Sequence, residues 1–210
     1  MCLGCLGPRP IIEAGFQEYV VLPAVVASHI PTSMSFEDAC VIPLCLSTAA
    51  TGLFDKTTLA LAHPKVEPQP TGKTVLIWGA ASSVGCNAVQ LAVSAGYEVV
   101  ATCSAKNFDL AKKLGAKEVY DYTQEGAVEQ IVAALKKTDF AGCLDAIHRH
   151  GAFEKCLEVV KELENGNKTV STVVPAFDPS ITIPEGVKTA TVFGSNLKVR
   201  LQHSRSWRHH

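Results

Sequence analysis

The strongest constraint on this chain is a regular alternation of β-prone and helical segments that begins at Lys73. Short runs rich in β-branched residues alternate with longer segments whose apolar residues recur every three to four positions. Repeated β-α-β units build a parallel sheet with helices on both faces, because each crossover must be right-handed and must cover the sheet. The sequence therefore predicts an α/β fold with a doubly wound parallel sheet, the Rossmann architecture.

The expected elements can be placed by residue range. The predicted strands are 74–78, 98–102, 118–120, 143–147, 169–174 and 191–193. The predicted helices between them are 84–95, 108–114, 127–135 and 153–163. Before this region, we expect a strand at 16–22, a helix start capped by Ser35 and an Ala- and Leu-rich helix over 44–61.

Composition excludes several classes of function. Lys and Arg total 19 against 20 Asp and Glu, a formal net charge of −1, so the chain lacks the broad basic surface that neutralises nucleic-acid phosphates. No apolar run approaches the ~18–20 residues of a membrane span. Residues 1–10 also lack the basic start and apolar core of a signal peptide. We therefore expect no nucleic-acid partner, no membrane partner and a cytoplasmic location.

The eight cysteines are scattered, and most have apolar neighbours, as at Cys103 and Cys143. Disulfide frameworks belong to small secreted domains with poor cores. The C-x-x-C motif from Cys2 to Cys5 has no second pair at zinc-finger spacing. Reduced thiols are the favoured interpretation, and no metal site is expected.

The turn after the first Rossmann strand has small residues where a dinucleotide fingerprint needs them. Aligning Gly85 with the third glycine of that fingerprint puts Ala80 and Ser82 at the first two positions. Ser82 and Ser83 can add hydroxyl donors to phosphate oxygens, while the helix that begins near Val84 receives the negative charge. The sequence thus predicts a diphosphate site over Ser82–Gly85. The alternative is a turn that only packs helix against strand.

The end of the second strand bears on the choice between NADPH and NADH. NAD-specific sites place a carboxylate about 20 residues beyond the glycines to accept the ribose 2′-hydroxyl, but here no carboxylate occurs until Asp109. Ser104 and Lys106 are instead suited to donate to an adenosine 2′-phosphate, because a carboxylate would repel that phosphate and a lysine attracts it. We therefore favour NADPH. The alternative is an ordinary helix cap with a solvated lysine.

Two histidines, His148 and His150, follow the fourth predicted strand at the edge of the sheet where ligands bind. A histidine there can donate to a cofactor or substrate near neutral pH. A surface histidine pair is the favoured interpretation, and binding is the alternative.

Several short motifs, in a fixed order from Gly15 to Lys198, carry a resemblance to a known superfamily. They are 15–20 (GFQEYV), 36–39 (FEDA), 48–49, 52–53, 82–85 (SSVG), 102–104 (TCS), 107–109 (NFD), 114–116 (LGA) and 120–122 (YDY). The chain resembles the medium-chain dehydrogenase/reductase superfamily. Within it, the zinc-free quinone and enoyl reductase branch fits best, and the fungal trans-acting enoyl reductases are most similar.

This resemblance implies roles by position. It implies cofactor contacts at Ser82, Ser83, Val84, Gly85, Ser104, Lys106, Asn107, Tyr122, Thr169 and Val170. It implies that the nicotinamide and substrate lie near Leu46, Ser47, Thr48, Ala49, Gly52 and Leu53. Two alternatives stay open: the Thr48 hydroxyl can bond a preceding carbonyl of its own helix, and Tyr122 can simply cover the sheet edge.

The resemblance also sets out an expected domain organisation. In the family, a GroES-like catalytic domain precedes the nucleotide domain and is completed after it. We expect a remnant of that domain with linking helices over 1–70, the NAD(P)-binding Rossmann domain over 71–198, and a basic tail outside the family over 199–210. The chain is thus expected to be truncated at both ends.

The expected function is an NADPH-dependent oxidoreductase that transfers a hydride to an activated C=C, as in enoyl reductases, or to a quinone or carbonyl. The small-molecule substrate is expected to be an enoyl thioester or a polyketide intermediate. No catalytic residue is assigned. The alternatives are a catalytically impaired nucleotide-binding fragment of such an enzyme and an α/β transferase using another adenosine cofactor. An exposed sixth strand would allow a homodimer.

Overall fold

A computed structural model of the chain describes residues 17–21, 27–174 and 178–192. Its contacts divide into two compact units, and the second, Ala49–Val192, contains the whole sheet. The strand expected at 16–22 does not form over its described part, 17–21, and its ends lie outside the described residues. The tail at 199–210 also lies outside them.

The first helices before the sheet are α1 (Phe36–Cys40) and α2 (Ile42–Phe54). The cap predicted at Ser35 forms, because its Oγ accepts a hydrogen bond from the amide of Asp38 at 3.0 Å. The helix expected over 44–61 ends earlier, at Phe54. The chain then turns, and the amide of Leu61 donates to the carbonyl of Leu53 at 2.9 Å.

The helical segment Phe36–Phe54 has 19 residues and a mean hydropathy of 1.2, enough to cross a membrane by length and composition alone. The core helix of a soluble protein passes the same test, so this single finding is weak support for a membrane span. This helix contradicts the expectation that no apolar run approaches the length of a membrane span. The absence of a membrane partner stays a prediction.

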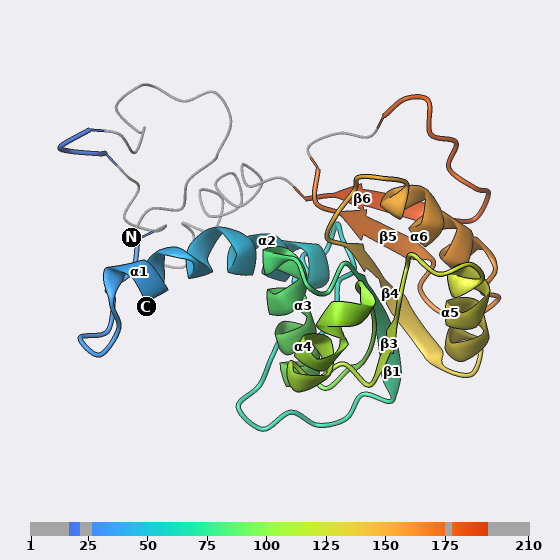
Figure 1. Ribbon diagram of the computed structural model, residues 1–210, viewed down its shortest axis with the longest axis horizontal. Helices are drawn as coiled ribbons and strands as arrows, with labels where there is room; N and C mark the ends of the chain where they lie inside the picture. Colours follow the sequence, from blue (N-terminus) through green and yellow to red (C-terminus); the bar gives the residue numbers. More distant parts are fainter. Residues whose placement is uncertain (1–16, 22–26, 175–177, 193–210) are drawn as a thin grey trace, which may run out of the picture. The chain divides into compact units, whose positions relative to one another are not determined.

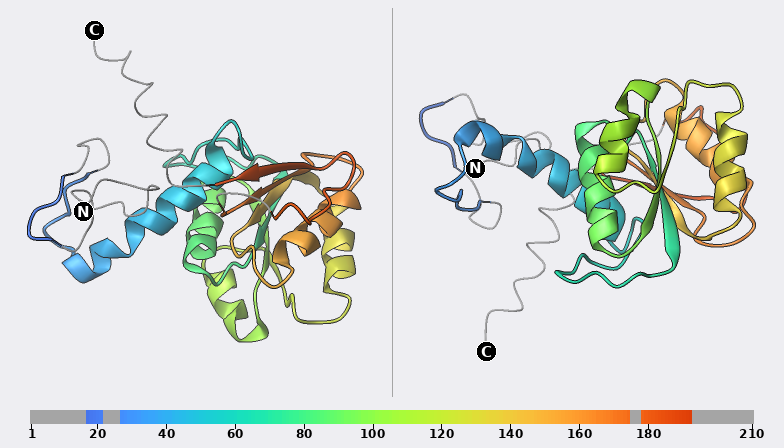
Figure 2. Two further views of the ribbon diagram at one scale, coloured as in Figure 1. Left: turned by 90° about the horizontal axis from the view of Figure 1, so that it is seen from above. Right: turned by 60° about the horizontal axis from the view of Figure 1, so that its bottom comes forward.

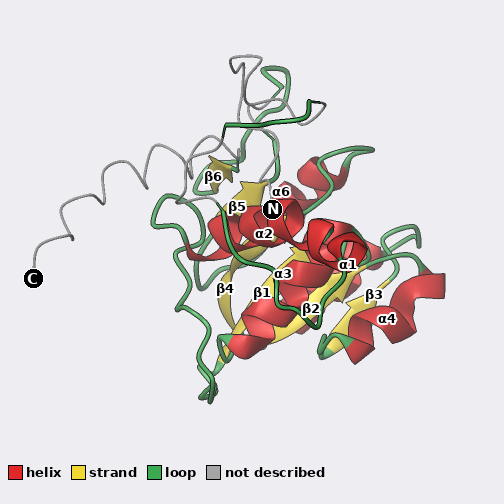
Figure 3. Cartoon of the chain, turned by 90° about the vertical axis from the view of Figure 1, so that its left-hand side faces the viewer, coloured by secondary structure: helices red, strands yellow, loops and turns green. Residues whose placement is uncertain are grey.

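The second unit is built on a six-stranded sheet in the order β3-β2-β1-β4-β5-β6 (Figures 1 and 3). All neighbouring strands pair in parallel. The strands are β1 (Lys73–Trp78), β2 (Glu98–Thr102), β3 (Glu118–Tyr120), β4 (Asp139–Asp145), β5 (Thr169–Thr172) and β6 (Lys188–Thr191). The helices are α3 (Ser83–Ser94), η3 (Ala105–Asn107), α4 (Phe108–Lys113), α5 (Ala127–Leu135) and α6 (Ala152–Lys161). The predicted doubly wound parallel sheet is confirmed.

Helices cover both faces of this sheet, with α3 and α4 on one side and α5 and α6 on the other (Figure 2). Successive side chains of a strand point to opposite faces, so β1 contributes to both layers. Val75 and Ile77 pack into one apolar cluster, and Leu76 and Trp78 pack into the other. All four are at most 2% exposed. Full burial of such a side chain stabilises the fold by about 1.5–3 kcal/mol.

Two strands begin earlier than predicted, for identifiable reasons. The strand β4 begins at Asp139 rather than 143. The predicted start is too late because Gly142, which has a φ of +125°, interrupts the β-prone pattern, and the pairing register with β1 shifts just before it. The strand β6 covers Lys188–Thr191 rather than 191–193. It is a short polar edge strand with a single neighbour, so no buried apolar run marks it.

Strand order reverses between β1 and β4, since the chain passes from β1 outward to β3 and then returns to the other side of β1. In open parallel sheets, ligands bind outside the carboxyl ends of the strands at such a switch point. The turn after Trp78 and the loop after Asp145 meet there, because the amide of Ala146 donates to the carbonyl of Trp78 at 3.0 Å.

Candidate functional site

The turn after β1 is fixed to the end of β2 by three hydrogen bonds. The amides of Gly79 and Ala80 both donate to the carbonyl of Thr102, at 3.1 and 2.8 Å. The amide of Gly79 also lies 3.1 Å from the buried Thr102 hydroxyl. Gly79 has a φ of +85°, which glycine adopts at little cost. The turn is therefore a rigid element rather than a freely moving loop.

Gly85 is the position in this turn where only glycine fits. A Cβ at this position would lie 2.1 Å from the carbonyl oxygen of Gly79 and 2.8 Å from the Cα of Ala80. Both obstacles are backbone atoms, which cannot rotate away as a side chain can. The first turn of α3 thus approaches the end of β1 directly, which is the function of the third glycine in a dinucleotide fingerprint.

The amino end of α3 presents backbone donors toward the same turn. Ser82 is the N-cap, and its Oγ accepts from the amide of Gly85 at 3.0 Å. In the described part of the chain, the amides of Ser83 and Val84 have no protein acceptor. Free first-turn amides and the positive end of the helix dipole favour an anion. The four residues predicted to bind a diphosphate therefore lie together.

The residues predicted for the adenosine phosphate lie in the turn after β2. Ser104 Oγ accepts a hydrogen bond from the side-chain amide of Asn107 at 3.1 Å, and Lys106 is exposed. Asn107 does not cap α4 through its side chain, as a simple helix start would require. This part of the turn is therefore held by its own side chains, with the Lys106 ammonium open to solvent.

Asp121, which follows β3, is a carboxylate near this turn that sequence reasoning missed. Its Oδ2 accepts from the amide of Ala105 at 3.3 Å. Hydrogen bonds from the hydroxyl and amide of Thr123 lower the pKa of the Asp121 carboxyl, so it is ionised at neutral pH. Its place in the sequence gives no signal, because only the parallel pairing of β2 with β3 brings it here.

Tyr122 packs against the apolar cluster on the side of α5 and α6, with its ring centroid 6.4 Å from that of Trp78. Its carbonyl accepts from the Lys155 ammonium at 3.0 Å. Through these contacts Tyr122 covers the edge of the sheet, which is the alternative interpretation of this residue. Its predicted contact with the adenine stays a prediction.

A second polar cluster lies at the carboxyl ends of β4 and β5. Asp145 is fully buried, and its Oδ1 accepts from the amides of Ile147 at 3.0 Å and His148 at 2.9 Å. Its Oδ2 accepts from the hydroxyl of Thr172, which is also fully buried, at 2.8 Å. The Nδ1 atom of His148 lies 3.0 Å from the same hydroxyl and 3.8 Å from Oδ2. A buried carboxylate with three donors fixes the loop after β4.

Most of the His148 side chain is therefore covered, so the favoured interpretation of a surface histidine pair fits His150 and not His148. Only 16% of its side chain is exposed, whereas His150 is exposed. Both residues have a φ of +57°, a left-handed conformation that non-glycine residues adopt at a cost. Such strain persists only where surrounding contacts over-determine it. For His148, those contacts are Asp145 and Thr172.

Thr169 and Val170, predicted to border the nicotinamide, lie at the beginning of β5 rather than at its end. The predicted strand ran to 174, and the observed one ends at Thr172, which occupies the ligand edge instead. The Thr169 hydroxyl donates to the side chain of Asn167 at 2.6 Å, and Val170 is fully buried. Val170 pairs with Cys143, which in turn pairs with Leu76, so the two residues lie within the sheet, below the turn after β1.

The residues predicted to lie near the substrate are all on α2. Ala49 and Leu53 are fully buried in the apolar core. Gly52 packs against β4, since a Cβ on it would lie 2.7 Å from Leu144. These three residues therefore pack the helix against the sheet.

The remaining predicted substrate residues are Leu46, Ser47 and Thr48. The hydroxyls of Ser47 and Thr48 donate to the carbonyl of Leu44, at 3.0 and 2.7 Å. For Thr48, this local bond within its own helix is the alternative to a contact with the substrate. Leu46 is half-buried.

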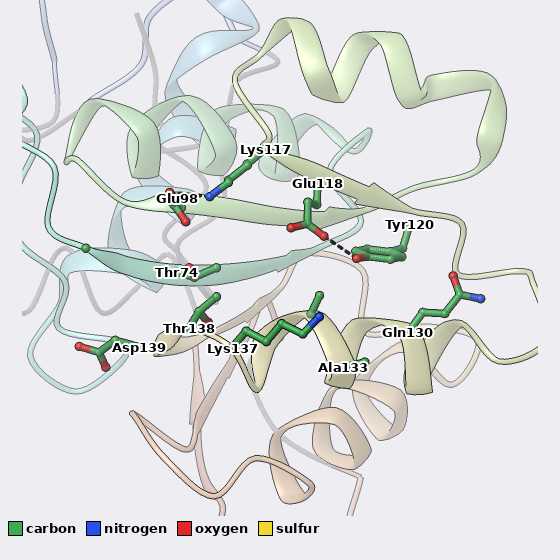
Figure 4. A pocket seen from close by; sticks show the side chains of 12 residues that line it. Thr74, Glu98, Lys117, Glu118, Tyr120, Gln130, Ala133, Lys137, Thr138 and Asp139 are labelled. Atoms are coloured by element: carbon green, nitrogen blue, oxygen red, sulfur yellow. Dashed lines mark hydrogen bonds and ion pairs between the residues drawn. The ribbon is translucent and has the colours of Figure 1, made fainter.

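A pocket of about 650 Å³ lies at the opposite edge of the sheet, between the strand starts and α5 (Figure 4). Thr74 and Glu118 line it, and the Thr74 hydroxyl is buried without a partner. Tyr120 donates to Glu118 at 2.5 Å, and burial together with that carboxylate raises the pKa of Tyr120 to about 12. Charges of both signs line this pocket, and it lies away from the switch point.

Among the described residues, no group of three or more His, Cys, Asp or Glu side chains is placed to hold a metal ion. The prediction that the protein works without zinc stays a prediction.

Comparison with known proteins identifies the family. Residues 83–197, just over half of the 210-residue chain, match the family described as zinc-binding dehydrogenase. The match begins at the first residue of α3 and so takes in most of the Rossmann unit.

Curated relatives and a solved structure agree with this match. The dehydrogenase azaJ of Aspergillus niger is 46% identical over 191 residues, which are 89% of this chain and 54% of the relative. The trans-enoyl reductase himH of Aspergillus japonicus is 37% identical over 186 residues, 89% of this chain and 52% of the relative. The crystal structure of CurK enoyl reductase has a TM-score of 0.63 at 26% identity, over 83% of this chain and 49% of that one. The chain spans about half the length of the curated relatives it matches.

Proposed function

The chain belongs to the zinc-binding dehydrogenase family, within the medium-chain dehydrogenase/reductase superfamily, and from this premise we propose that its Rossmann unit binds NADPH for a reductase. The proposed reaction is hydride transfer to an activated C=C, with a quinone or carbonyl as the other acceptor classes. The observation that carries the proposal is the close approach of Gly85 to the backbone of Gly79 at the start of α3.

The residues of the turn fit a diphosphate. The absence of a Cβ at Gly85 lets the first turn of α3 pack directly against the end of β1, which brings the amino end of the helix to the turn. The free amides of Ser83 and Val84 and the hydroxyls of Ser82 and Ser83 are donors for phosphate oxygens. Because the turn is tied to Thr102, these donors are held in place before a ligand arrives. When bound, the reduced dinucleotide supplies the hydride.

The preference for NADPH rests on the balance of two charges, Lys106 in the turn after β2 and Asp121 in the loop after β3. The exposed Lys106 ammonium attracts an adenosine 2′-phosphate, and Ser104 can donate to it. The ionised Asp121 carboxylate, bonded to the amide of Ala105, opposes the same phosphate. We favour NADPH because the Lys106 ammonium makes no ion pair with a described residue and so is available to a phosphate. The Asp121 carboxylate, by contrast, already accepts hydrogen bonds from the amide and hydroxyl of Thr123.

Opposite substitutions at these two positions are expected to change NADPH affinity in opposite directions. Lys106→Gln should weaken NADPH binding about fivefold, because it removes a charge that is worth ~1 kcal/mol near a phosphate in water. Asp121→Asn should strengthen NADPH binding by a similar factor. Neither substitution should change NADH affinity beyond about twofold, since NADH carries no 2′-phosphate. Fluorescence titration with both coenzymes measures all four values.

The matched control for this experiment is Lys112→Gln, which removes an exposed lysine from α4. It should leave both affinities unchanged. If Lys106→Gln weakens NADPH and NADH equally, the preference for NADPH is contradicted while dinucleotide binding stands.

We propose an enoyl thioester or a polyketide intermediate as the substrate, supported by the name trans-enoyl reductase of the relative himH.

The second candidate function is a nucleotide-binding fragment with impaired catalysis, which the coverage of about half of each relative favours. The 210-residue chain should bind NADPH with little turnover of model enoyl thioesters. Robust turnover by this chain would contradict the fragment. A cytoplasmic location, a homodimer through β6 and independence from zinc are parts of the same proposal.

A further inference from the structure

The cluster of Asp145, Thr172 and His148 fixes which nitrogen of the imidazole carries the proton. The single hydroxyl proton of Thr172 goes to Asp145 Oδ2, because the carboxylate can only accept. Thr172 Oγ1 must therefore accept from His148 Nδ1, which lies 3.0 Å away. The neutral imidazole thus carries its proton on Nδ1 and presents the lone pair of Nε2.

The same contacts also fix the orientation of the ring. The centroid of the His148 ring lies 5.2 Å from that of Phe153, on α6, and the backbone amide of His148 is held by Asp145 Oδ1. Among the described residues, Nε2 has no hydrogen-bond partner, and it is not one of the buried unpaired atoms, so it reaches the surface. The exposed Asp178 carboxylate is a further charged group close enough to interact with His148.

The loop that carries His148 borders the diphosphate turn. Ile147, the residue before His148, packs against Gly79, because a Cβ at Gly79 would come within 2.3 Å of the Ile147 side chain. The loop after β4 therefore borders the turn on one side, and the loops after β2 and β3 border it on the other. A Rossmann dinucleotide places its adenosine ribose at the end of the second strand. The rest of the dinucleotide must extend across the switch point toward β4 and β5.

We propose that His148 Nε2 accepts a hydrogen bond from the nicotinamide half of the bound dinucleotide, and that Asp145 and Thr172 are positioning residues that fix the tautomer for this contact. This inference rests on the proposed function, since it requires that the turn binds NADPH. It gives a role to a half-buried histidine with a left-handed backbone at the edge of the site. No other described contact uses the Nε2 atom.

The first test separates the two halves of the cofactor. His148→Asn removes the imidazole and its Nε2 atom, and asparagine tolerates the positive φ at this position. It should weaken NADPH binding about three- to tenfold, the range of one hydrogen bond, and leave the affinity for adenosine 2′,5′-bisphosphate unchanged. His150→Asn is the matched control, because His150 has the same φ but is exposed. It should change neither affinity.

The second test reads the tautomer directly and needs no cofactor. Nitrogen NMR of the free protein above the titration of its imidazoles should show His148 protonated on Nδ1. Thr172→Val, which removes the hydroxyl, should abolish the preference for protonation on Nδ1 and weaken NADPH binding. Thr172→Ser, which keeps a hydroxyl, should retain both the Nδ1 tautomer and the NADPH affinity. An Nε2-protonated His148 in the wild-type protein would overturn the inference.

The outcomes distinguish this inference from the function on which it rests. If the wild-type chain binds NADPH but His148→Asn binds it equally well, or weakens both probes alike, the contact proposed here is overturned and the function stands. If the wild-type chain binds neither probe, the proposed function itself is contradicted, and the inference falls with it.

Discussion

Replacing Gly85 with alanine is expected to destabilise the Rossmann unit by about 1–3 kcal/mol and to weaken NADPH binding about tenfold or more. The added Cβ would lie 2.1 Å from the carbonyl oxygen of Gly79. Because that carbonyl belongs to a turn tied to Thr102, relief of the clash requires α3 to move away from β1. The same movement withdraws the amides of Ser83 and Val84 from the ligand.

The control for this variant is Gln90→Ala on the same helix. Gln90 is exposed, and its side-chain amide donates to the carbonyl of Cys86 in its own helix, so its loss should change stability by no more than about 0.5 kcal/mol. Urea unfolding gives the free energies, and fluorescence titration gives the affinities. A Gly85→Ala protein with normal stability and normal NADPH affinity would show that the turn has a different geometry.

Removing the Asp145 side chain is expected to lower the free energy of unfolding by roughly 3 kcal/mol. Asp145→Ala leaves the amides of Ile147 and His148 and the hydroxyl of Thr172 without their acceptor at a fully buried position. Each unsatisfied buried donor costs about 1–3 kcal/mol, and water entering the cavity recovers part of this cost. The melting temperature should fall by about 10 °C.

Asp139→Ala provides a comparison on the same strand. Asp139 lies at the other end of β4 and pairs with Lys73 at 3.6 Å, but both side chains are about half exposed. Exposed ion pairs contribute about 0–1 kcal/mol, so this variant should unfold nearly as the wild-type chain does. Equal losses for the two aspartates would contradict the structural role assigned to Asp145.

Much of the fold can be predicted from this sequence because its signals are local. The β1 run of apolar and β-branched residues and the stripe of Val128, Ile131, Val132 and Leu135 report burial through their spacing alone. The helix stop at Gly115 is equally local, since its φ of +108° suits glycine. Where the local signal is interrupted, as by Gly142 in β4, the predicted boundary is displaced by several residues.

The candidate site was predictable only where its residues are neighbours in sequence. Ser82 to Gly85 form one turn, so the fingerprint contains them all. Asp121 and Thr172 reach the site through strand pairing, which no spacing rule reveals. The sequence placed His148 at the correct edge, but its burial depends on a hydroxyl 24 positions away.

The most direct measurement is a calorimetric titration of NADPH into the 210-residue chain, followed by thermal melting with and without the coenzyme. We expect a saturable heat of binding and a melting temperature that rises with coenzyme concentration, because a ligand that binds only the folded state stabilises it. Both effects should be greatly reduced in Gly85→Ala. The absence of heat and of any thermal shift at millimolar NADPH would show that the turn after β1 does not bind this coenzyme.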